Sequence, residues 1–441
     1  MDLVTGRAAS ADDTTTQANS TSDTMDALVI HGGRKLEGRV EISGAKNAAL
    51  PVMAATLLAP GVHTLRNVPL LRDTKTMAAV LEKLGARVEF RGRACKIDTS
   101  NLNSQEAPYD LVKTMRASIY VLGPLLARFG NARVSLPGGC AWGPRPVDLH
   151  LQGLNSMGAN LDIDHGYVVG RNVKLHGSKF NFPVVSVGAT AQLMMAGVLA
   201  DGETVLDNVA LEPDITVLGE VLVQCGARIE GLGTRRMVIQ GVKTLLPIDT
   251  TIIPDRIEAA TFLGAAAITG GNLTLERCEP SHVAASIHVL EEMGCEVLPG
   301  NDHVTIIGPK RPRAVSITTA PYPGFPTDMQ AQMMAIAAIA DGTSVITDTI
   351  YLDRFTHVPE LGRLGAKIEL KNNVALVRGV EKLQGAPVMA TDIRAGAGLV
   401  LAALAAEGET RISRVYHLDR GHEALDQKLA KLGASIERVR E

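Results

Sequence analysis

The segment VLEKLGARVEF at residues 80–90 decides the fold, because its pattern recurs along the whole chain. Its first half has the apolar spacing of a helix, with Leu81 and Leu84 on one face. Gly85 follows, and glycine most easily takes the left-handed conformation found just past a helix end. Residues 86–90 then alternate as a strand does. The segment therefore predicts a helix joined to a strand through a glycine.

Six copies of this phrase occur, each with Leu, Met or Cys before the glycine and usually Ala after it. The six glycines are Gly85, Gly158, Gly226, Gly294, Gly365 and Gly433. Their separations indicate a repeat of about 70 residues. A second phrase, a helix of small residues that ends in glycine before a strand, interleaves with the first and centres on Gly61, Gly130, Gly202, Gly271, Gly342 and Gly408. We therefore expect six units of two helices with strands after them, in two groups of three, rather than generic α/β alternation.

Length, composition and charge favour a globular protein of two large domains. The 441 residues exceed the roughly 100–200 residues of one ordinary domain. Aromatic residues make up only 3% of the chain, so small and aliphatic side chains must fill the interior. Lys and Arg number 44 against 47 acidic residues, a net charge of −3, which gives no general attraction to nucleic acid or to an anionic membrane. Any anion-binding site must be local.

The cysteines and the N-terminal sequence favour a cytoplasmic location. Five cysteines are an odd and scattered set without metal or redox spacing: Cys95, Cys140, Cys225, Cys278 and Cys295. No basic segment followed by an apolar core opens the chain, and no stretch approaches the roughly 18 apolar residues of a membrane span. Residues 1–24 are expected to be a disordered extension, with Met25 as a possible alternative start.

The segment LPGGCAWGPRPVDLH at residues 136–150 closely resembles the active-site loop of the UDP-N-acetylglucosamine enolpyruvyl transferases, a branch of the EPSP synthase superfamily. The resemblance runs from residue 25 to residue 441. Other matching segments follow in the order of the family at 43–48, 113–118, 186–190, 254–258, 325–330, 354–360, 392–394 and 419–421. Separated matches in the right order carry more weight than any one of them.

The resemblance implies an inside-out α/β fold of two domains, each with three βαβαββ units whose sheets face solvent. This agrees with the independent count of six units. One domain would comprise 46–253 and carry the catalytic loop at about 136–147, and the other would combine 25–45 with 254–441. The two chain crossovers would form a hinge that lets the domains close on substrate.

The family reaction transfers the enolpyruvyl group of phosphoenolpyruvate to the 3-hydroxyl of UDP-N-acetylglucosamine and releases phosphate, the first committed step of peptidoglycan synthesis. Both substrates are anions, so the site needs clustered cations, and guanidinium groups bind carboxylate and phosphate bidentately. The cations within the matching segments are Lys46, Arg116, Arg145, Arg354, Arg394 and Arg420. An arginine outside such a segment is usually a solvated surface charge.

Cys140 lies among Gly138, Gly139 and Gly143 and close to Arg145, where positive charge and open backbone amides favour a thiolate. The resemblance implies that Cys140 protonates carbon 3 of phosphoenolpyruvate, can form a covalent adduct with it and is alkylated by fosfomycin. The alternative, an inert small hydrophobe, is the interpretation for the other four cysteines.

Small departures from the family pattern concern the loop and one helix. Trp142 and Pro144 stand where the family has smaller residues, so a bulkier and stiffer loop is expected. Gly396 and Gly398 replace common serines, and no catalytic effect is expected from them.

Two acids are candidates for proton transfer. From sequence alone, Asp328 is an ordinary acid at a helix start after Pro326. The resemblance makes it the general base beside the attacking sugar hydroxyl, for which a raised pKa is useful. Asp392 either orients Lys46 or handles protons, or has a structural role.

The nucleotide is expected to contact one group of residues in two segments, where helix N-termini offer amides to phosphate. These residues are Arg145, Pro146, Val147, Asp148, Leu149, Ser186, Val187 and Gly188, and the residues that complete the substrate contacts are Asn47, Asp328 and Ile350. Ser186 by itself would be a helix cap. The acids Glu212, Asp255 and Glu258 are expected to be interdomain polar groups.

The expected partners are the two small-molecule substrates. The histidines are dispersed without ligand spacing, so no metal and no cofactor is expected, nor is nucleic acid, membrane or an obligate protein partner. One alternative is the shikimate-pathway enolpyruvyl transferase, for which we know no equivalent of the Cys140 loop. The other is a catalytically silent UDP-sugar-binding paralogue, against which the retention of acid, base and cations argues.

Overall fold

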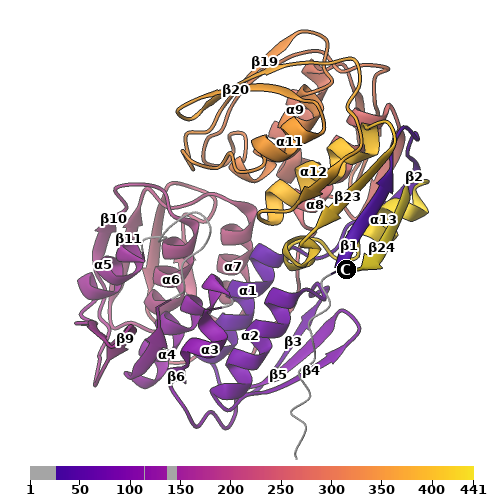
Figure 1. The fold of residues 1–441 in the computed structure, drawn as a ribbon. Helices are drawn as coiled ribbons and strands as arrows, with labels where there is room; N and C mark the ends of the chain where they lie inside the picture. The colour runs from indigo at the N-terminus through magenta and orange to yellow at the C-terminus, as the bar shows by residue number, and fades with distance from the viewer. Residues whose placement is uncertain (1–25, 114, 137–146) are drawn as a thin grey trace, which may run out of the picture.

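A computed structural model describes residues 26–113, 115–136 and 147–441, and in these ranges six four-stranded sheets form two domains (Figure 1). Each domain has its own hydrophobic core. The first core draws on residues between Ala45 and Ile252, and the second on residues 28–42 and 257–434. The predicted two-domain fold with six units is confirmed, while the boundaries at 46 and 253 stay a prediction.

The first domain contains the elements from α1 to β14. Its helices are α1 (Lys46–Ala55), α2 (Arg72–Lys83), α3 (Tyr109–Val112), α4 (Leu122–Phe129), α5 (Asp148–Ser156), α6 (Val187–Gly197) and α7 (Pro213–Gln224), with the 3-10 helices η1 (Thr56–Leu58) and η2 (Arg116–Val121). Its strands are β3 (Val62–Arg66), β4 (Arg87–Arg91), β5 (Ala94–Asp98), β6 (Glu106–Ala107), β7 (Ala132–Ser135), β8 (Asp162–Asp164), β9 (Tyr167–Gly170), β10 (Lys179–Asn181), β11 (Glu203–Asp207), β12 (Arg228–Glu230), β13 (Arg236–Gln240) and β14 (Asp249–Thr251). They form sheets of order β14-β3-β5-β4, β6-β7-β9-β8 and β10-β11-β13-β12.

The second domain contains the two N-terminal strands and everything after β14. Its helices are α8 (Arg256–Thr269), α9 (Ala284–Glu292), α10 (Gln330–Ala337), α11 (Val358–Arg363), α12 (Ile393–Ala405) and α13 (Leu425–Lys431), with η3 (Pro280–Val283), η4 (Thr327–Met329) and η5 (Val415–Arg420). Its strands are β1 (Asp26–His31), β2 (Glu37–Glu41), β15 (Asn272–Glu276), β16 (Glu296–Pro299), β17 (His303–Ile307), β18 (Ser316–Thr318), β19 (Thr343–Thr347), β20 (Lys367–Lys371), β21 (Val374–Arg378), β22 (Pro387–Met389), β23 (Glu409–Ser413) and β24 (Ser435–Arg440). They form sheets of order β16-β17-β15-β2, β18-β19-β21-β20 and β22-β23-β1-β24.

All six sheets have the same pattern of strand pairing, with one parallel and two antiparallel pairs. In the β6-β7-β9-β8 sheet, β6 is parallel to β7, and the other two pairs are antiparallel, as a βαβαββ unit requires. Two sheets take a strand from a distant part of the chain, since β14 pairs with β3 and β1 pairs with β23 and β24. In addition, β2 pairs with β15 although the whole first domain lies between them in the sequence. The first domain is thus inserted into the first unit of the second.

Helices occupy the interior of each domain and sheets occupy its periphery (Figure 1). In the second domain α8, α10 and α12 pack against one another, and every residue of α10 is buried. Small side chains permit this packing: a Cβ added at Gly264 would lie 3.1 Å from Leu401 and 3.3 Å from Ile336. The strands alternate between buried and exposed residues, as in β17, because one sheet face is solvated. Each domain is therefore inside-out, with its helices buried in the centre and its sheets facing solvent.

The repeat glycines do what the sequence predicts. The six glycines of the first phrase have φ between +86° and +102°, the left-handed region that favours glycine. In the second phrase five of the six glycines also have positive φ, and in the remaining unit Gly270, the residue before Gly271, has it. Gly271 instead allows a close approach, since an added Cβ would lie 2.3 Å from the carbonyl oxygen of Leu36.

The two crossovers between the domains run side by side. Gly44 and Pro254 form an antiparallel bridge, and the Ala45 N–H donates to the Ile253 carbonyl at 2.7 Å. A Cβ at Gly44 would lie 1.8 Å from the carbonyl oxygen of Asn67, so only glycine fits there. This paired ribbon joins the domains directly beside the start of α1.

Candidate active site

A carboxylate on the first domain binds two predicted site cations at once. Lys46 is the first residue of α1, Asp73 lies in the first turn of α2, and Arg420 ends η5 of the second domain. The Lys46 Nζ donates to Asp73 Oδ2 at 3.3 Å, and the Arg420 Nε donates to Asp73 Oδ1 at 3.0 Å. The Lys46 and Asp73 side chains are only 10% and 5% exposed. The contact therefore assembles a buried site from both domains.

The environment of Lys46 opposes its positive charge. Burial is the largest effect and lowers the pKa of Lys46, Asp73 opposes the lowering, and Arg394 and Arg420 add to it. The Lys46 backbone N–H donates to Asp255 Oδ2 at 3.3 Å, which fixes the beginning of α1 against the second domain. Asp73 thus favours the ammonium form of Lys46 against the effects of burial and of the two arginines.

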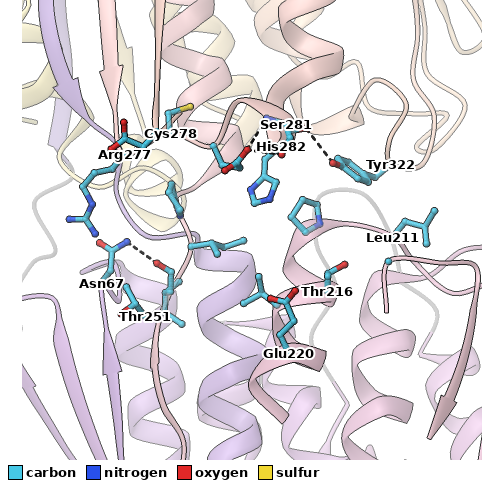
Figure 2. Close-up of a pocket in the computed structure, with 18 of the residues that line it drawn as sticks. Asn67, Leu211, Thr216, Glu220, Thr251, Arg277, Cys278, Ser281, His282 and Tyr322 are labelled. Atoms are coloured by element: carbon cyan, nitrogen blue, oxygen red, sulfur yellow. Dashed lines mark hydrogen bonds between the residues drawn. The ribbon is translucent and has the colours of Figure 1, made fainter. Parts of the chain in front are cut away.

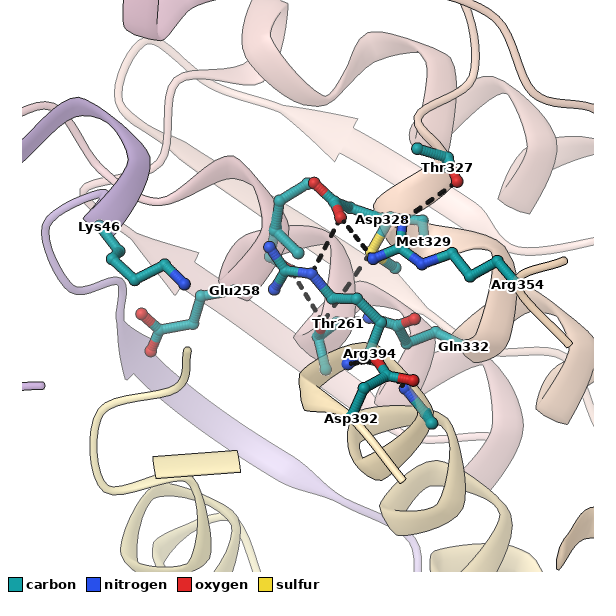
Figure 3. Close-up of polar contacts among 12 residues, drawn as sticks. Lys46, Glu258, Thr261, Thr327, Asp328, Met329, Gln332, Arg354, Asp392 and Arg394 are labelled. Carbon is teal, nitrogen blue, oxygen red and sulfur yellow. Dashed lines mark hydrogen bonds and ion pairs between the residues drawn. The ribbon is translucent and has the colours of Figure 1, made fainter. Parts of the chain in front are cut away.

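A second cluster surrounds Asp328 (Figure 3). Asp328 lies in η4, where Arg354 Nη2 donates to its Oδ1 at 3.0 Å and Arg394 Nε donates to the same oxygen at 3.1 Å. Arg354 Nη1 also donates to Thr327 Oγ1 at 3.1 Å. Both contacts to Asp328 use Oδ1, so the described bonds leave Oδ2 available as a proton acceptor. Figure 3 shows Lys46 extending from α1 toward this region.

The pKa of Asp328 is lowered in this arrangement, whereas a raised pKa would be useful for a general base. Burial alone raises the pKa of Asp328, but the positive charges of Arg394, Arg354 and Arg256 together hold it well below its usual range. Asp328 is a carboxylate here, and a weak base as long as these arginines have no other anion to bind.

The described hydrogen bonds of Asp392 are those of a helix cap. It is the N-cap of α12, and its Oδ1 accepts from the N–H groups of Arg394 at 2.7 Å and Ala395 at 3.1 Å. Its described bonds start the helix that carries Arg394, whereas the described polar contacts of Lys46 are with Asp73 and Asp255. The structure thus supports the structural alternative for Asp392.

The two segments expected to bind the nucleotide lie next to each other. Ser186 caps α6, and its Oγ accepts from the Ala189 N–H at 3.3 Å. The start of α5 is adjacent, because the ring of His150 lies 3.0 Å from a Cβ built on Gly188. Burial lowers the pKa of His150 to about 4, so this ring is neutral. The remaining residues of these segments are half-buried except for exposed Asp148: Val147, Leu149, Val187 and Gly188.

Several predicted site residues have no described contact in this site. Outside the described residues are Cys140, Arg145 and Pro146, together with loop positions Trp142 and Pro144 and the side chain of Arg116. Asn47 is half-buried next to Lys46. Ile350 is exposed, and its N–H donates to Asp348 Oδ1 at 2.9 Å.

The other four cysteines are buried, and burial raises the pKa of each thiol: to about 12 for Cys95, Cys278 and Cys295, and to about 11 for Cys225. A buried thiol with such a pKa is unreactive near neutral pH. This supports their interpretation as packing residues.

The acids expected between the domains do lie there. Asp255 caps α8 and accepts from Lys46. Glu258 is buried, accepts from the Ser43 N–H at 3.1 Å and pairs with Lys428, which also donates to Ser43 Oγ at 2.7 Å. Burial raises the pKa of Glu258 to about 7, and Lys428 opposes this only in part. Burial likewise raises the pKa of Glu212.

Sequence reasoning missed Asp73 and a second pair of the same kind, Asp214 with Arg256. The Asp214 Oδ2 lies 3.6 Å from Arg256 Nε, with Asp214 on α7 of the first domain and Arg256 on α8 of the second. Asp73 and Asp214 each stand twelve residues before the glycine that follows their helix, Gly85 and Gly226. Aligning the repeats would have found both acids.

A separate hollow of about 770 Å³ lies against the crossover (Figure 2). Ile252, Ile253 and Pro254 line it, and the His282 ring points into it. None of the predicted site residues lines it, and its one lining cation, Arg277, is paired with Glu41 at 2.8 Å. The predicted site cations lie instead in the Asp73 and Asp328 clusters.

Neither a membrane-spanning helix nor a metal-binding group of side chains occurs in the described ranges. In those ranges no helix is long and apolar enough to cross a membrane. The same part of the chain contains no group of three or more His, Cys, Asp or Glu residues that could hold a metal ion.

Cations buried between two α/β domains are what an enzyme needs to hold anionic substrates between its domains, and comparisons with known proteins agree. The model of the EPSP synthase (3-phosphoshikimate 1-carboxyvinyltransferase) family matches residues 30–429. A UDP-N-acetylglucosamine 1-carboxyvinyltransferase of Geobacter metallireducens is 56% identical over 417 residues, 95% of this chain and all of the relative. One of Acinetobacter baylyi is 52% identical over 94% of this chain.

Solved structures give the same fold. The enolpyruvyl transferase NikO from Streptomyces tendae has a TM-score of 0.86 at 29% identity, and EPSP synthase from Acinetobacter baumannii has 0.75 at 17%. Each comparison covers 95% of this chain and 100% of the other. The chain belongs to the EPSP synthase family and, within it, to the branch of the UDP-N-acetylglucosamine 1-carboxyvinyltransferases.

Proposed function

We propose that this protein transfers the enolpyruvyl group of phosphoenolpyruvate to the 3-hydroxyl of UDP-N-acetylglucosamine and releases phosphate. The observation that carries the proposal is near full-length identity of 52–56% to relatives named for this reaction. The clustering of Lys46, Arg354, Arg394 and Arg420 at the domain interface supports it. EPSP synthase is a more distant relative, at 17% identity.

The cations bind the two anionic groups of phosphoenolpyruvate. Arg420 uses only Nε in its described bonds, so its terminal nitrogens are available to a phosphate or carboxylate. Arg354 and Arg394 bind Asp328 in the absence of substrate and can turn to the incoming anion. The nucleotide lies along the starts of α5 and α6, with Ser186, Val187 and Gly188 on one side, and Arg145 with Pro146 to Leu149 on the other. Arg116, Asn47 and Ile350 complete the substrate contacts.

The chemistry is an addition followed by an elimination. Asp328 accepts the proton of the sugar hydroxyl as its oxygen attacks carbon 2 of phosphoenolpyruvate, and Cys140 donates a proton to carbon 3. Loss of a proton from carbon 3 then restores the double bond as phosphate leaves carbon 2. Substrate anions that draw Arg354 and Arg394 away from Asp328 raise its pKa at the moment when it must act as a base.

The proposed role is the first committed step of peptidoglycan synthesis in the cytoplasm, with consequences for cell wall, cell shape and cell division. Phosphoenolpyruvate and UDP-N-acetylglucosamine are the proposed partners, and no metal, cofactor or obligate protein partner has a part in the mechanism. Cys140 would form the adduct with phosphoenolpyruvate and react with fosfomycin.

Phosphate release from phosphoenolpyruvate tests the proposal, with UDP-N-acetylglucosamine or shikimate 3-phosphate as acceptor. Release with the UDP-sugar alone is expected. Release with shikimate 3-phosphate alone would assign the protein to the other branch of the family. Release with neither would favour a protein that binds UDP-sugars without turnover.

A further inference from the structure

We infer that Asp73 is a positioning residue, which holds Lys46 and Arg420 together across the domain interface and keeps both cations oriented for the phosphate of the substrate. The inference deepens the proposed function and rests on it for the identity of the anion. Asp73 is not among the residues that the sequence predicted for the site.

The geometry leaves donors free for a ligand. Asp73 uses one oxygen for each cation, Oδ2 for the Lys46 Nζ and Oδ1 for the Arg420 Nε. An ammonium has three donors and a guanidinium has five, so most of their hydrogen-bonding capacity remains. The Nε contact directs the planar fork of Arg420, whose terminal nitrogens suit a phosphate. Asp73 thus orients the cations without saturating them.

The electrostatics explain why a carboxylate is needed there. Lys46 is buried and faces Arg394 of α12 and Arg420 of η5, which both disfavour its charge. His422, just after η5, is buried, and burial lowers the pKa of its ring to about 3, so this neutral ring does not offset the charge of Lys46. Asp255 meets the backbone of Lys46, and Glu258 is paired with Lys428. Asp73 is therefore the carboxylate that bonds the ammonium itself.

The repeat supports the assignment independently. Asp214 occupies the position equivalent to Asp73 in another unit of the first domain, and it also contacts an arginine of the second domain, Arg256. Both acids are buried. The same repeat position thus forms an ion pair between the domains in two units. Of the two acids, only Asp73 also binds a lysine that is predicted to contact substrate.

The test measures the protonation of Lys46 in the full chain. Acylation of Lys46 by acetic anhydride, followed by peptide mass spectrometry, requires the neutral amine and so reports its pKa. In Asp73→Asn the loss of the negative charge lowers that pKa, and the acylation profile moves to lower pH by about 1 to 3 pH units. Asp73→Glu keeps the charge and retains the wild-type profile. The exposed pair Arg66–Asp249 of the same domain supplies the control Asp249→Asn, which leaves the profile unchanged.

Steady-state kinetics add a second readout. In Asp73→Asn the KM for phosphoenolpyruvate rises about tenfold for each pH unit by which the Lys46 pKa falls below the assay pH, while the KM for the UDP-sugar changes little.

An unchanged acylation profile in Asp73→Asn would overturn the inference. If Asp73→Asn does not fold, the Asp73→Glu variant provides the test instead. A Lys46 acylation profile that is shifted to lower pH in Asp73→Glu would contradict the inference. A shifted profile in an enzyme inactive on phosphoenolpyruvate would leave the inference standing and remove the proposed function.

Discussion

Asp328 and Glu258 are carboxylates of the same domain near the same interface, yet their pKa values move in opposite directions. Glu258 is buried beside one cation, Lys428, and its pKa rises to about 7. Asp328 is less buried and has Arg394, Arg354 and Arg256 around it, and its pKa falls. In this interface the number of facing cations, and not burial alone, sets the direction in which the pKa of an acid moves.

The fold explains the difference. Asp328 lies in η4, where the beginnings of α8 and α12 bring Arg256 and Arg394 toward it. Glu258 lies one turn into α8 beside the crossover, where Ser43 and Lys428 are its partners. In the proposed mechanism a substrate anion would compete for the arginines of Asp328, whereas Glu258 has no predicted site residue among its described bonds. Asp328 is thus the acid whose basicity depends on substrate.

The largest expected effect comes from removing the Asp328 carboxylate. Asp328→Asn retains the size of the side chain but cannot accept the sugar hydroxyl proton, so kcat falls by about 10²- to 10⁴-fold. Steady-state phosphate release measures it. Asp341→Asn, which alters an exposed acid of the same domain, is the control. A fall of less than tenfold in Asp328→Asn would argue against its role as base.

A smaller effect on rate but a clear effect on pH dependence is expected from Arg354→Gln. One cation fewer raises the pKa of Asp328, so the acidic limb of kcat/KM moves to higher pH by about 1 pH unit or more. The KM for phosphoenolpyruvate also rises, because a bidentate ligand of the anion is lost. Arg363→Gln removes an exposed arginine as control. An acidic limb that stays in place would show that Arg354 does not control Asp328.

Glu258→Gln should change the pH dependence of stability. The pKa of Glu258 is about 7 in the folded protein and 4.5 in the unfolded chain. Between pH 4.5 and about pH 7 the folded state therefore binds a proton on Glu258 that the unfolded chain has lost. That contribution is fully present below pH 4.5 and is lost as pH rises through about 7, at about 1.4 kcal/mol per pH unit or roughly 3 kcal/mol in total. Urea unfolding at pH 5 and pH 8 measures it. The variant should gain stability relative to wild type at the higher pH, and a constant difference would contradict the raised pKa.

The smallest effect is expected at the edge of the interface. Arg93 contacts Glu423 at 3.0 Å, and its side chain is 31% exposed. Exposed ion pairs contribute about 0.2–1 kcal/mol. Because only 12% of the Glu423 side chain is exposed, Arg93→Gln should lower the free energy of unfolding by an amount near the upper end of that range, about 1 kcal/mol. Urea unfolding in low and high salt tests this, with little remaining difference expected in high salt. A loss of several kcal/mol would mean that this pair, too, is part of the buried interface.

The sequence predicts the fold far better than it predicts the electrostatics of the site. The six repeat glycines and their spacing foretell six units because each needs a left-handed residue after a helix. The borrowed strands β1 and β14 could not be assigned, since each pairs with a strand far away in the chain. The role of Asp73 could not be predicted for the same reason, because its partner Arg420 is 347 positions away in the sequence.

The cations of the site were found through their motifs, and the acids were harder to interpret. Lys46 and Arg420 share the Asp73 carboxylate, and Arg354 and Arg394 share that of Asp328, from four different elements or loops. The lowered pKa of Asp328 depends on three arginines that are distant from it in sequence. A helix-start acid such as Asp392 looks the same in sequence whether it caps a helix or transfers a proton.

The central claim, transfer to a UDP-sugar with Asp328 as base, is tested most directly by nuclear magnetic resonance of the complete reaction. The account predicts one equivalent of inorganic phosphate and one of a UDP-sugar carrying new vinyl protons for each phosphoenolpyruvate consumed, with both products lost together in Asp328→Asn. Phosphate without the vinyl product, or the same vinyl product from Asp328→Asn at the wild-type rate, would contradict it.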